Sequence, residues 1–292
     1  MPDNYLENQV NGEPKPLKKK PKWWVVVIDI FFLFVFLLVI AISSNVIYLT
    51  SAYGEPFFVS GASMYPTLNS EGFKYIKEKN EYRPLTWNDI DNDDGDIVDY
   101  GWAKAGDKDN WRSDLHRYDI VITYYPKDYI NYSSNQLKSN ASLKIKRLIG
   151  FPGETVKFER DDVFNPVWGK TTIIKPDGQE EVLPNLYDVE DFPDLPNGTK
   201  YLSRGVTGAR TLSLGEDEYF VMGDNRVGSH SEDSRTVGAL KEKMIQGKAY
   251  IITGMRKLSV TIDDQGNKAK EPKFLLDKLR MPWNYKKLEY KI

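Results

Sequence analysis

The chain contains no cysteine, which excludes disulfides, thiolate catalysis and cysteine-ligated zinc sites. Only two histidines occur, His116 and His230, so a histidine-rich metal site is excluded and a serine nucleophile would find few imidazole bases. The formal net charge is -2 over 292 residues, whereas nucleic-acid-binding proteins usually carry a basic excess. We therefore expect no nucleic-acid partner.

One long apolar segment runs from about Trp23 to Tyr48, and residues 30–42 are apolar without interruption. This span exceeds the roughly 20 residues that a helix needs to cross a bilayer. Tryptophan and tyrosine stand at its two ends, where amphipathic rings favour the membrane interface. The sequence therefore predicts a transmembrane anchor over residues 23–49.

Two alternatives to a plain anchor remain open. Asp29 lies inside the apolar segment, where a mid-membrane carboxylate costs roughly 2.5–3.5 kcal/mol. It lies near the start of the helix, so it can reach the headgroups, and the alternative is a functional intramembrane acid. A cleaved signal peptide is the second alternative, because residues 51–54 (SAYG) offer small side chains. The apolar region is longer than the usual core of such a peptide, which favours the anchor.

The basic residues predict the orientation of the anchor. Five lysines precede the apolar segment, and the next basic residue along the chain is Lys74. Because positive charge stays on the cytoplasmic side, we expect a cytoplasmic tail over residues 1–22 and an extracytoplasmic domain over residues 50–292. The tail is polar, rich in lysine and contains prolines, which predicts disorder.

The extracytoplasmic part reads as strands and turns, and we expect a mainly β fold built on an antiparallel sheet. Its short segments are rich in β-branched and aromatic residues and end at Gly, Pro, Asn or Asp. The turn at 151–154 (FPGE) predicts that residues 155–159 form a hairpin with the strand before it. The expected strands are 57–59, 72–79, 118–125, 143–149, 155–159, 218–222 and 248–253.

Three regions depart from this strand pattern. Residues 80–115 are rich in Asn, Asp and Trp, and residues 160–216 are rich in Pro, Asp and Gly. We expect both to be surface inserts, the second with room for a small β subdomain. Residues 273–280 (KFLLDKLR) predict a short amphipathic helix that packs on the domain or touches lipid.

Residues 60–68 (SGASMYPTL) place Ser63 on a tight, glycine-permitted turn just beyond the anchor, as expected of a nucleophile. Serine needs a base to take its proton. His116 with Asp119 is one option. A lysine is the other, because burial among apolar groups lowers its pKa by several units. Within strand 143–149, Lys144 and Lys146 share one face, so alternation alone does not choose between them.

Four blocks, in this order along the chain, resemble the type I signal peptidases of the Gram-positive type. That family comprises membrane-bound serine–lysine enzymes that remove signal peptides from secreted proteins. The blocks are residues 61–68 (GASMYPTL), 117–121 (RYDIV), 145–154 (IKRLIGFPGE), and 222–226 with 231–235 (MGDNR and SEDSR). They cover a small part of a domain that the resemblance extends from about residue 50 to 260.

The resemblance implies roles at matching positions. Ser63 matches the nucleophile and Lys146 the general base. Gly61 stands where some members carry a serine whose hydroxyl is the second oxyanion donor, and losing one such donor can cost about 2.7–4 kcal/mol. Ser60, one position away, is the candidate to take over this role. Ser231 matches the serine that hydrogen-bonds the lysine, and the polar framework of the site matches Asp224, Arg226, Asp233 and Arg235.

This chain departs from the family pattern in two places. Tyr118 replaces a glycine, which predicts a different turn before its strand. The spacing after Arg226 is two residues longer than usual, so Ser229 is an alternative to Ser231 as the partner of the lysine. The upstream residues 95–98 (GDIV) imitate the second block but lack its preceding arginine.

The resemblance also implies substrates and a site of action. Secretory preproteins with small residues, commonly Ala, at positions −3 and −1 would bind as an added strand. We expect Phe57, Phe58, Val59 and Met64 to line that pocket, with no metal or cofactor. The other partners are the lipid bilayer and, by proximity, the translocon. Two alternatives are another serine–lysine peptidase, which the anchor disfavours, and a catalytically silent anchored relative that acts as a surface binding module.

Overall fold

The computed structural model describes residues 22–76, 78–79, 81–84, 97–105, 110–159, 169–187, 210–226, 231–262 and 268–288. The chain divides into two units, Met1–Tyr48 and Leu49–Ile292. Most of the expected tail, residues 1–21, lies outside the described residues, as do Ser229 and His230.

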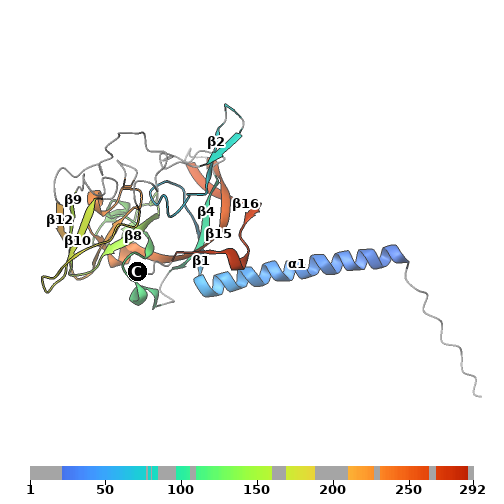
Figure 1. Cartoon of the computed structure of the whole chain (residues 1–292), viewed down its shortest axis with the longest axis horizontal. Helices are drawn as coiled ribbons and strands as arrows, with labels where there is room; N and C mark the ends of the chain where they lie inside the picture. The colour runs from blue at the N-terminus through green and yellow to red at the C-terminus, as the bar shows by residue number, and fades with distance from the viewer. Residues whose placement is uncertain are drawn as a thin grey trace, which may run out of the picture. The chain divides into compact units, whose positions relative to one another are not determined.

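A single helix, α1 (Trp23–Tyr53), holds the apolar segment (Figure 1). Its 31 residues extend about 46 Å at 1.5 Å per residue, against a hydrocarbon core of about 30 Å. It is long and apolar enough to cross a membrane, and its apolar side chains are mostly exposed. This confirms the helix predicted from the sequence, which continues a few residues beyond the expected end.

The larger unit is built on an antiparallel sheet of eleven strands in the described part of the chain. Eight of them follow the order β14-β13-β8-β5-β15-β4-β2-β3, while β1 pairs with β4, and β16 and β17 pair with β15. The strands are β1 (Glu55–Phe58), β2 (Phe73–Ile76), β3 (Glu81–Pro84), β4 (Ile97–Ala105), β5 (Ile120–Thr123), β8 (Lys144–Gly150), β13 (Glu218–Met222), β14 (Leu240–Lys241), β15 (Ile245–Ile262), β16 (Lys268–Leu279) and β17 (Lys286–Lys287).

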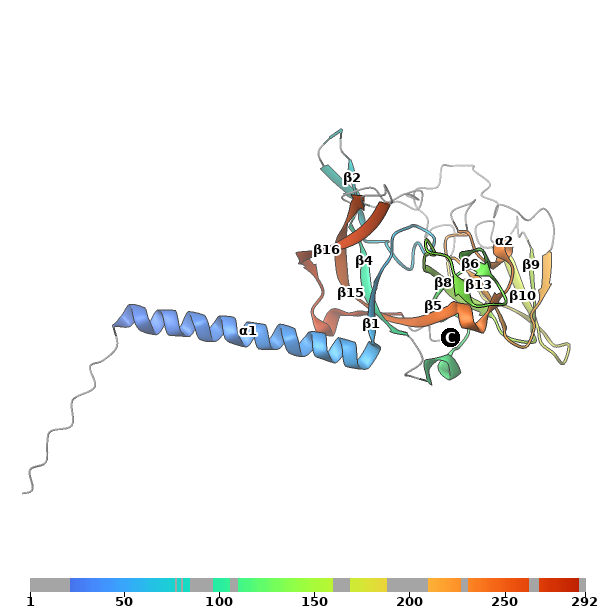
Figure 2. The same cartoon turned by 180° about the vertical axis from the view of Figure 1, so that it is seen from behind.

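Strand β15 organises this sheet because it pairs with β5, β4, β16 and β17 along its 18 residues (Figure 2). Register shifts between Ala249 and Ile251 and between Ile252 and Gly254 interrupt its pairing with β4. Such irregularities bend a strand and increase its twist. The bends allow one strand to serve several partners in succession.

A smaller, four-stranded sheet follows β8 in the order β11-β10-β9-β12. Its core contains Val156, Phe158 and Ile173, which pack with Tyr118 from the turn before β5 and with Phe220 from β13. Its strands are β9 (Thr155–Glu159), β10 (Lys170–Ile174), β11 (Glu180–Val182) and β12 (Arg210–Ser213). Three of them lie within the expected insert 160–216.

The remaining elements are short. The strands β6 (Tyr129–Asn131) and β7 (Gln136–Leu137) form a hairpin, and α2 (Ser234–Val237) is a single helical turn. The 3-10 helices are η1 (Asn110–Asp114), η2 (Pro126–Asp128), η4 (Glu242–Met244) and η5 (Pro282–Asn284).

The predicted mainly β fold is confirmed, and strands were expected at the positions of β1, β2, β5, β8, β9, β13 and the middle of β15. The expected hairpin between 143–149 and 155–159 is wrong. Strand β8 pairs with β5 and β13, whereas β9 pairs with β10 and β12. The turn between them therefore carries the chain from one sheet to the other.

The prediction that residues 80–115 form a surface insert is wrong for 97–105. These residues are strand β4, which pairs with β15, β1 and β2 and is largely buried. The sequence of this strand does not show the apolar pattern of a buried strand, because it contains the charged residue Asp99, which is 3% exposed, and the glycine Gly101. Gly101 is needed there, since a Cβ atom would lie 2.3 Å from the carbonyl oxygen of Ile251.

The amphipathic helix predicted over 273–280 is also wrong, because this segment lies in strand β16. The pairs Arg256↔Phe274 and Ile262↔Lys268 mark its antiparallel register on β15. A short helical pattern is a weak signal, and pairing with an available strand edge overrides it here.

The close approach of β4 to β15 leads to a testable prediction. We expect Gly101→Ala to lower the thermal midpoint of unfolding by several degrees, because overpacking typically costs about 1–3 kcal/mol. Thr211→Val, on an exposed position of β12, serves as the control and should leave the midpoint unchanged. Equal midpoints for Gly101→Ala and the wild-type chain in detergent would contradict this packing.

Candidate functional site

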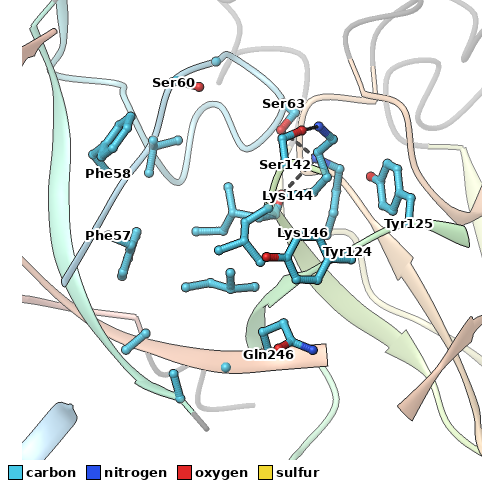
Figure 3. A pocket seen from close by; sticks show the side chains of 18 of the residues that line it. Phe57, Phe58, Ser60, Ser63, Tyr124, Tyr125, Ser142, Lys144, Lys146 and Gln246 are labelled. Atoms are coloured by element: carbon cyan, nitrogen blue, oxygen red, sulfur yellow. Dashed lines mark hydrogen bonds between the residues drawn. The ribbon is translucent and has the colours of Figure 1, made fainter. Parts of the chain in front are cut away.

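A pocket of about 820 Å³ lies between the segment from β1 to Ser63 and the start of β8 (Figure 3). Figure 3 shows Phe57 and Phe58 on one side of it, with Tyr124, Lys144 and Lys146 across from them. The pocket therefore places an apolar wall opposite a wall that carries amines.

Backbone hydrogen bonds build the turn that carries Ser63. Within the turn, the Tyr65 N–H donates to the Ala62 carbonyl at 3.1 Å. The backbone N–H of Asn225 donates to the Ser63 carbonyl at 3.1 Å, and its side-chain amide donates to the Ala62 carbonyl at 3.0 Å. Both bonds fix the peptide groups on either side of the serine, so Asn225 is a bracing residue of the site.

Asn69 holds the entry to the same turn. Its side-chain amide donates to the carbonyls of Val59 and Gly61, each at 3.0 Å. Its side-chain oxygen accepts from the Asp99 N–H, and its own N–H donates to the Asp99 carboxylate, both at 2.8 Å. Asn69 has a positive φ of 66°, a conformation that asparagine tolerates better than most residues. The turn is thereby tied to strand β4.

Lys146 contacts Ser63 directly. Its Nζ lies 2.9 Å from Ser63 Oγ and 2.9 Å from the carbonyl oxygen of Ile145. The residue is 4% exposed, and this burial lowers the pKa of its ammonium to about 8, although Asp233 opposes the shift. An amine with this pKa is substantially neutral at mildly alkaline pH and can accept the proton of the serine hydroxyl.

The two other candidate bases lie elsewhere. Lys144 lines the pocket, but its Nζ contacts Ser142 Oγ. The His116 ring is exposed and does not line the pocket that holds Ser63, and Asp119 pairs with the buried Lys248 at 2.8 Å. The geometry thus favours Lys146 over both alternatives that the sequence left open.

Ser231 lies close to the pair, but its hydroxyl donates to Asp233 Oδ2 at 2.8 Å. Among the described side chains, no hydrogen bond joins Ser231 to Lys146, unlike the contact that the resemblance implies. Gly223 separates Ser231 from the turn: a Cβ atom there would lie 2.1 Å from Ser231 Oγ and 2.5 Å from the Ser63 carbonyl oxygen. A glycine is therefore required between them.

Asp233 is the centre of one polar cluster. It accepts from the Gly223 N–H at 2.9 Å and from both Nε and Nη2 of Arg235 at 2.8 Å. Burial works against its ionised form, but the charge and hydrogen bonds of Arg235 prevail, so its pKa is lowered. Asp233 is thus a paired, ionised carboxylate.

Asp224 is the centre of the second cluster. Arg147 grips it with Nε at 2.7 Å from Oδ1 and Nη2 at 2.5 Å from Oδ2. Thr67 also hydrogen-bonds to Asp224 through its hydroxyl and accepts from Arg147 Nη2 at 3.1 Å. Arg226 is buried beside Gly223, with its Nε 3.4 Å from the Gly223 carbonyl, and burial lowers its pKa to about 9.

The predicted pocket residues divide into two groups. Phe57, Phe58 and Val59 line the pocket. Met64 is wrong as a lining residue, because it is fully buried in a core cluster with Leu68 and Ile120. The Met64 side chain fixes the Ser63 turn to this core cluster.

Gly61 and Ser60 are the two residues that bear on the second oxyanion donor. Gly61 lines the pocket without a side chain, and Ser60 lies on the same wall. Among the described contacts, none joins the Ser60 hydroxyl to Ser63 or Lys146.

In the part of the chain that the structure describes, no group of three or more His, Asp and Glu side chains is arranged to hold a metal ion.

Tyr118 occupies the turn where the resemblance implies a glycine. It has φ of 73°, the left-handed conformation that glycine adopts most easily, so the glycine-like turn persists with a tyrosine in it. The ring is fully buried among the residues of the smaller sheet, and this packing offsets the unfavourable backbone. The neighbouring Arg117 pairs with Glu154 at 2.7 Å, which joins this turn to the one after β8.

Sequence reasoning missed four bracing residues: Thr67, Asn69, Arg147 and Asn225. The position of Arg147 was predictable, because alternation along β8 places its side chain on the other face of the strand from Lys146. Asn225 lies within a block that was recognised, but nothing in its identity showed that it reaches the serine turn. Thr67 and Asn69 act through contacts with residues about 30 to 160 positions away, which spacing alone does not reveal.

Comparison with known proteins identifies the family of the chain. The chain matches the family described as "Signal peptidase, peptidase S26" over residues 27–253. It is 33% identical over 133 residues to signal peptidase I V of Bacillus subtilis (strain 168), a match that covers 46% of this chain and 63% of that protein. Signal peptidase I U of the same organism is 25% identical over 244 residues, covering 83% of this chain and 94% of that protein.

Among solved structures, the chain is similar to a crystal structure of a signal peptidase I from Enterococcus faecalis V583. The two are 27% identical, with a TM-score of 0.31, and the match covers 46% of this chain and 95% of that one. Since the family match spans most of the chain, the protein belongs to the signal peptidase family, peptidase S26.

Proposed function

We propose that this protein is a membrane-anchored serine endopeptidase that removes N-terminal signal peptides from secreted preproteins. The observation that carries the proposal is the 2.9 Å contact between the buried amine of Lys146 and the hydroxyl of Ser63. Membership of the signal peptidase family supports the substrate class. We assign Ser63 as the nucleophile and Lys146 as the general base.

The reaction proceeds in two halves. Neutral Lys146 takes the proton of Ser63 as its oxygen attacks the scissile carbonyl carbon, and the ammonium then donates that proton to the departing amine of the mature protein. The resulting ester links the signal peptide to Ser63. Lys146, neutral again, takes a proton from water as that water attacks the ester, and returns it to the serine oxygen as the signal peptide leaves. The backbone N–H of Ser63 is one donor to the oxyanion.

The pocket suits an extended peptide with small residues at the cleavage site. We propose that the segment binds as an added strand, so that alternate side chains enter the pocket. Phe57, Phe58 and Val59 offer an apolar wall for the small residues of Ala-x-Ala sites. Phe58 and Val59 precede the Ser63 turn along the chain, which places the wall beside the nucleophile.

The polar clusters hold the site, and the anchor places it. Two ion pairs, Asp224 with Arg147 and Asp233 with Arg235, brace the segments around the dyad, and none of their residues lines the pocket. Helix α1 fits a single membrane anchor, and the lysine-rich tail supports a cytoplasmic N-terminus with the pocket on the outer side. Proximity to the translocon follows from the substrate class. A catalytically silent relative would keep the fold, but it would not need the buried amine of Lys146 in contact with the Ser63 hydroxyl.

The first prediction of the proposed function tests the dyad. We expect Lys146→Met to lower cleavage of an Ala-x-Ala preprotein by about 10²–10⁴-fold, the usual contribution of a general base. Ser63→Ala should lower it at least as far, because it removes the nucleophile itself. Lys144→Met is the matched control, two residues earlier on the same strand face, and it should remain active. Cleavage is measured with the detergent-solubilised full chain. Near-normal cleavage by Lys146→Met would refute the assignment, and equal products from Ser63→Ala and wild type would refute the function.

The second prediction concerns pH. Because burial lowers the pKa of Lys146 to about 8, kcat/KM should rise with pH up to about 8 and level off above it, as the amine loses its proton. The positive charge of Lys144 contributes to the low pKa of Lys146. Lys144→Met should therefore move the rise of kcat/KM to higher pH. A flat profile between pH 6 and 9, with chemistry rate-limiting, would show that no group of this kind acts as the base.

The third prediction concerns orientation and uses the absence of cysteine from the chain. A cysteine at the exposed Val182 (Val182→Cys) should react with a membrane-impermeant maleimide in intact cells. A cysteine in the tail (Gln9→Cys) should react only after the membrane is permeabilised. The reverse pattern would place the pocket on the cytoplasmic side.

A further inference from the structure

The C-terminal segment 280–288 contacts the turn that carries the nucleophile. This segment contains η5 and β17 and lies beyond residues 27–253, which match the family. Its strand β17 pairs with β15 through Ile251↔Lys287 and Ile252↔Lys286. The segment is therefore fixed to the central strand of the large sheet.

Lys286 reaches the turn directly. Its Nζ donates to the backbone carbonyl of Thr67 at 2.7 Å, a charge-assisted hydrogen bond. The hydroxyl of the same threonine is held by Asp224 and Arg147. Thr67, four residues after the nucleophile, is thus held at its backbone by the C-terminal segment and at its side chain by the buried ion pair.

Leu288 supports the turn from below. It is 6% exposed and packs in the core cluster that contains Val59, Met64 and Leu68, which flank Ser63 on both sides. Its N–H donates to the Tyr250 carbonyl at 2.8 Å, which fixes it to β15. The hydrophobic floor of the turn therefore includes a residue from the last part of the described chain.

Arg280 adds a third contact at the far end of the segment. Its N–H donates to the Thr253 carbonyl at 3.0 Å, and its Nη2 pairs with Glu71 at 2.6 Å. The charges of Arg280 and Lys286 both act on Asp99, the buried partner of Asn69: burial raises the pKa of Asp99, and these two cations oppose that shift. The segment thus also favours the ionised carboxylate that holds the entry of the turn.

We propose that residues 280–288 form a C-terminal strap that sets the position of the Ser63 turn, with Lys286 as its main positioning residue. The inference rests on the proposed function for its kinetic consequence, but not for its structural one. Lys286 does not line the pocket, so it acts through Thr67 and not on the substrate. Misplacement of a reacting group by about 1 Å can cost about 10²-fold in rate, so a single brace at this turn matters for turnover.

The kinetic test compares Lys286→Met with Lys287→Met in the detergent-solubilised full chain. Lys287 is the matched control, because it is the adjacent, exposed residue of β17 and points to the other face of the strand. We expect Lys286→Met to lower kcat about tenfold or more with little change in KM, and Lys287→Met to leave both unchanged. Lys286→Arg, which keeps a cationic donor, should restore most of the loss.

A second readout does not depend on cleavage. Hydrogen exchange of peptides covering residues 59–72 should be faster in Lys286→Met than in Lys287→Met, while exchange in the smaller sheet stays the same. If Lys286→Met is not obtained folded, Lys286→Gln replaces it in both measurements. Unchanged kcat together with unchanged exchange over 59–72 would overturn the strap. If the wild-type chain cleaves no preprotein, the proposed function fails, and the exchange measurement alone decides on the strap.

Discussion

The proposed dyad depends on a lowered pKa for a lysine that lies near carboxylates. Asp233 and Asp224 both act on Lys146 and favour its ammonium, whereas burial disfavours it, and burial prevails. Each carboxylate is already paired with an arginine, Arg235 or Arg147, at hydrogen-bonding distance. Because each carboxylate is paired with its own arginine, the two carboxylates do not keep Lys146 protonated. An unpaired carboxylate in either place would raise the pKa of the lysine and remove its capacity to act.

Alternation along β8 is the simplest part of this arrangement. Successive side chains of a strand point to opposite faces, so Lys146 faces the pocket while Arg147 faces Asp224. One strand thereby supplies both the amine and the main brace of the serine turn, since Arg147 also contacts Thr67. The turn itself is tied to several elements: Asn69 links it to β4 and Asn225 to the segment after β13. The geometry of the Ser63 turn therefore depends on contacts with several parts of the large sheet.

The sequence predicted the long apolar helix, the β class and seven of the seventeen described strands, because hydropathy and strand composition are local signals. It suggested Ser63 as a nucleophile from its turn, but it chose Lys146 as the base only through resemblance, since alternation cannot separate Lys146 from Lys144. It failed where pairing with distant strands decides the outcome: β4 looked like a polar insert, and residues 273–280 looked helical but pair with β15. Lys286 carried no signal at all, because its role depends on a contact with a carbonyl 219 positions away.

The central claim is that burial lowers the pKa of the Lys146 ammonium far enough for its amine to act as the base. The most direct measurement follows the side-chain nitrogen or ε-carbon of selectively labelled lysines by NMR as a function of pH, with the Lys146 signal assigned by its loss in Lys146→Met. We predict that this signal titrates near pH 8 in the folded chain. Titration near 10.4, the ordinary value for lysine, would contradict the account.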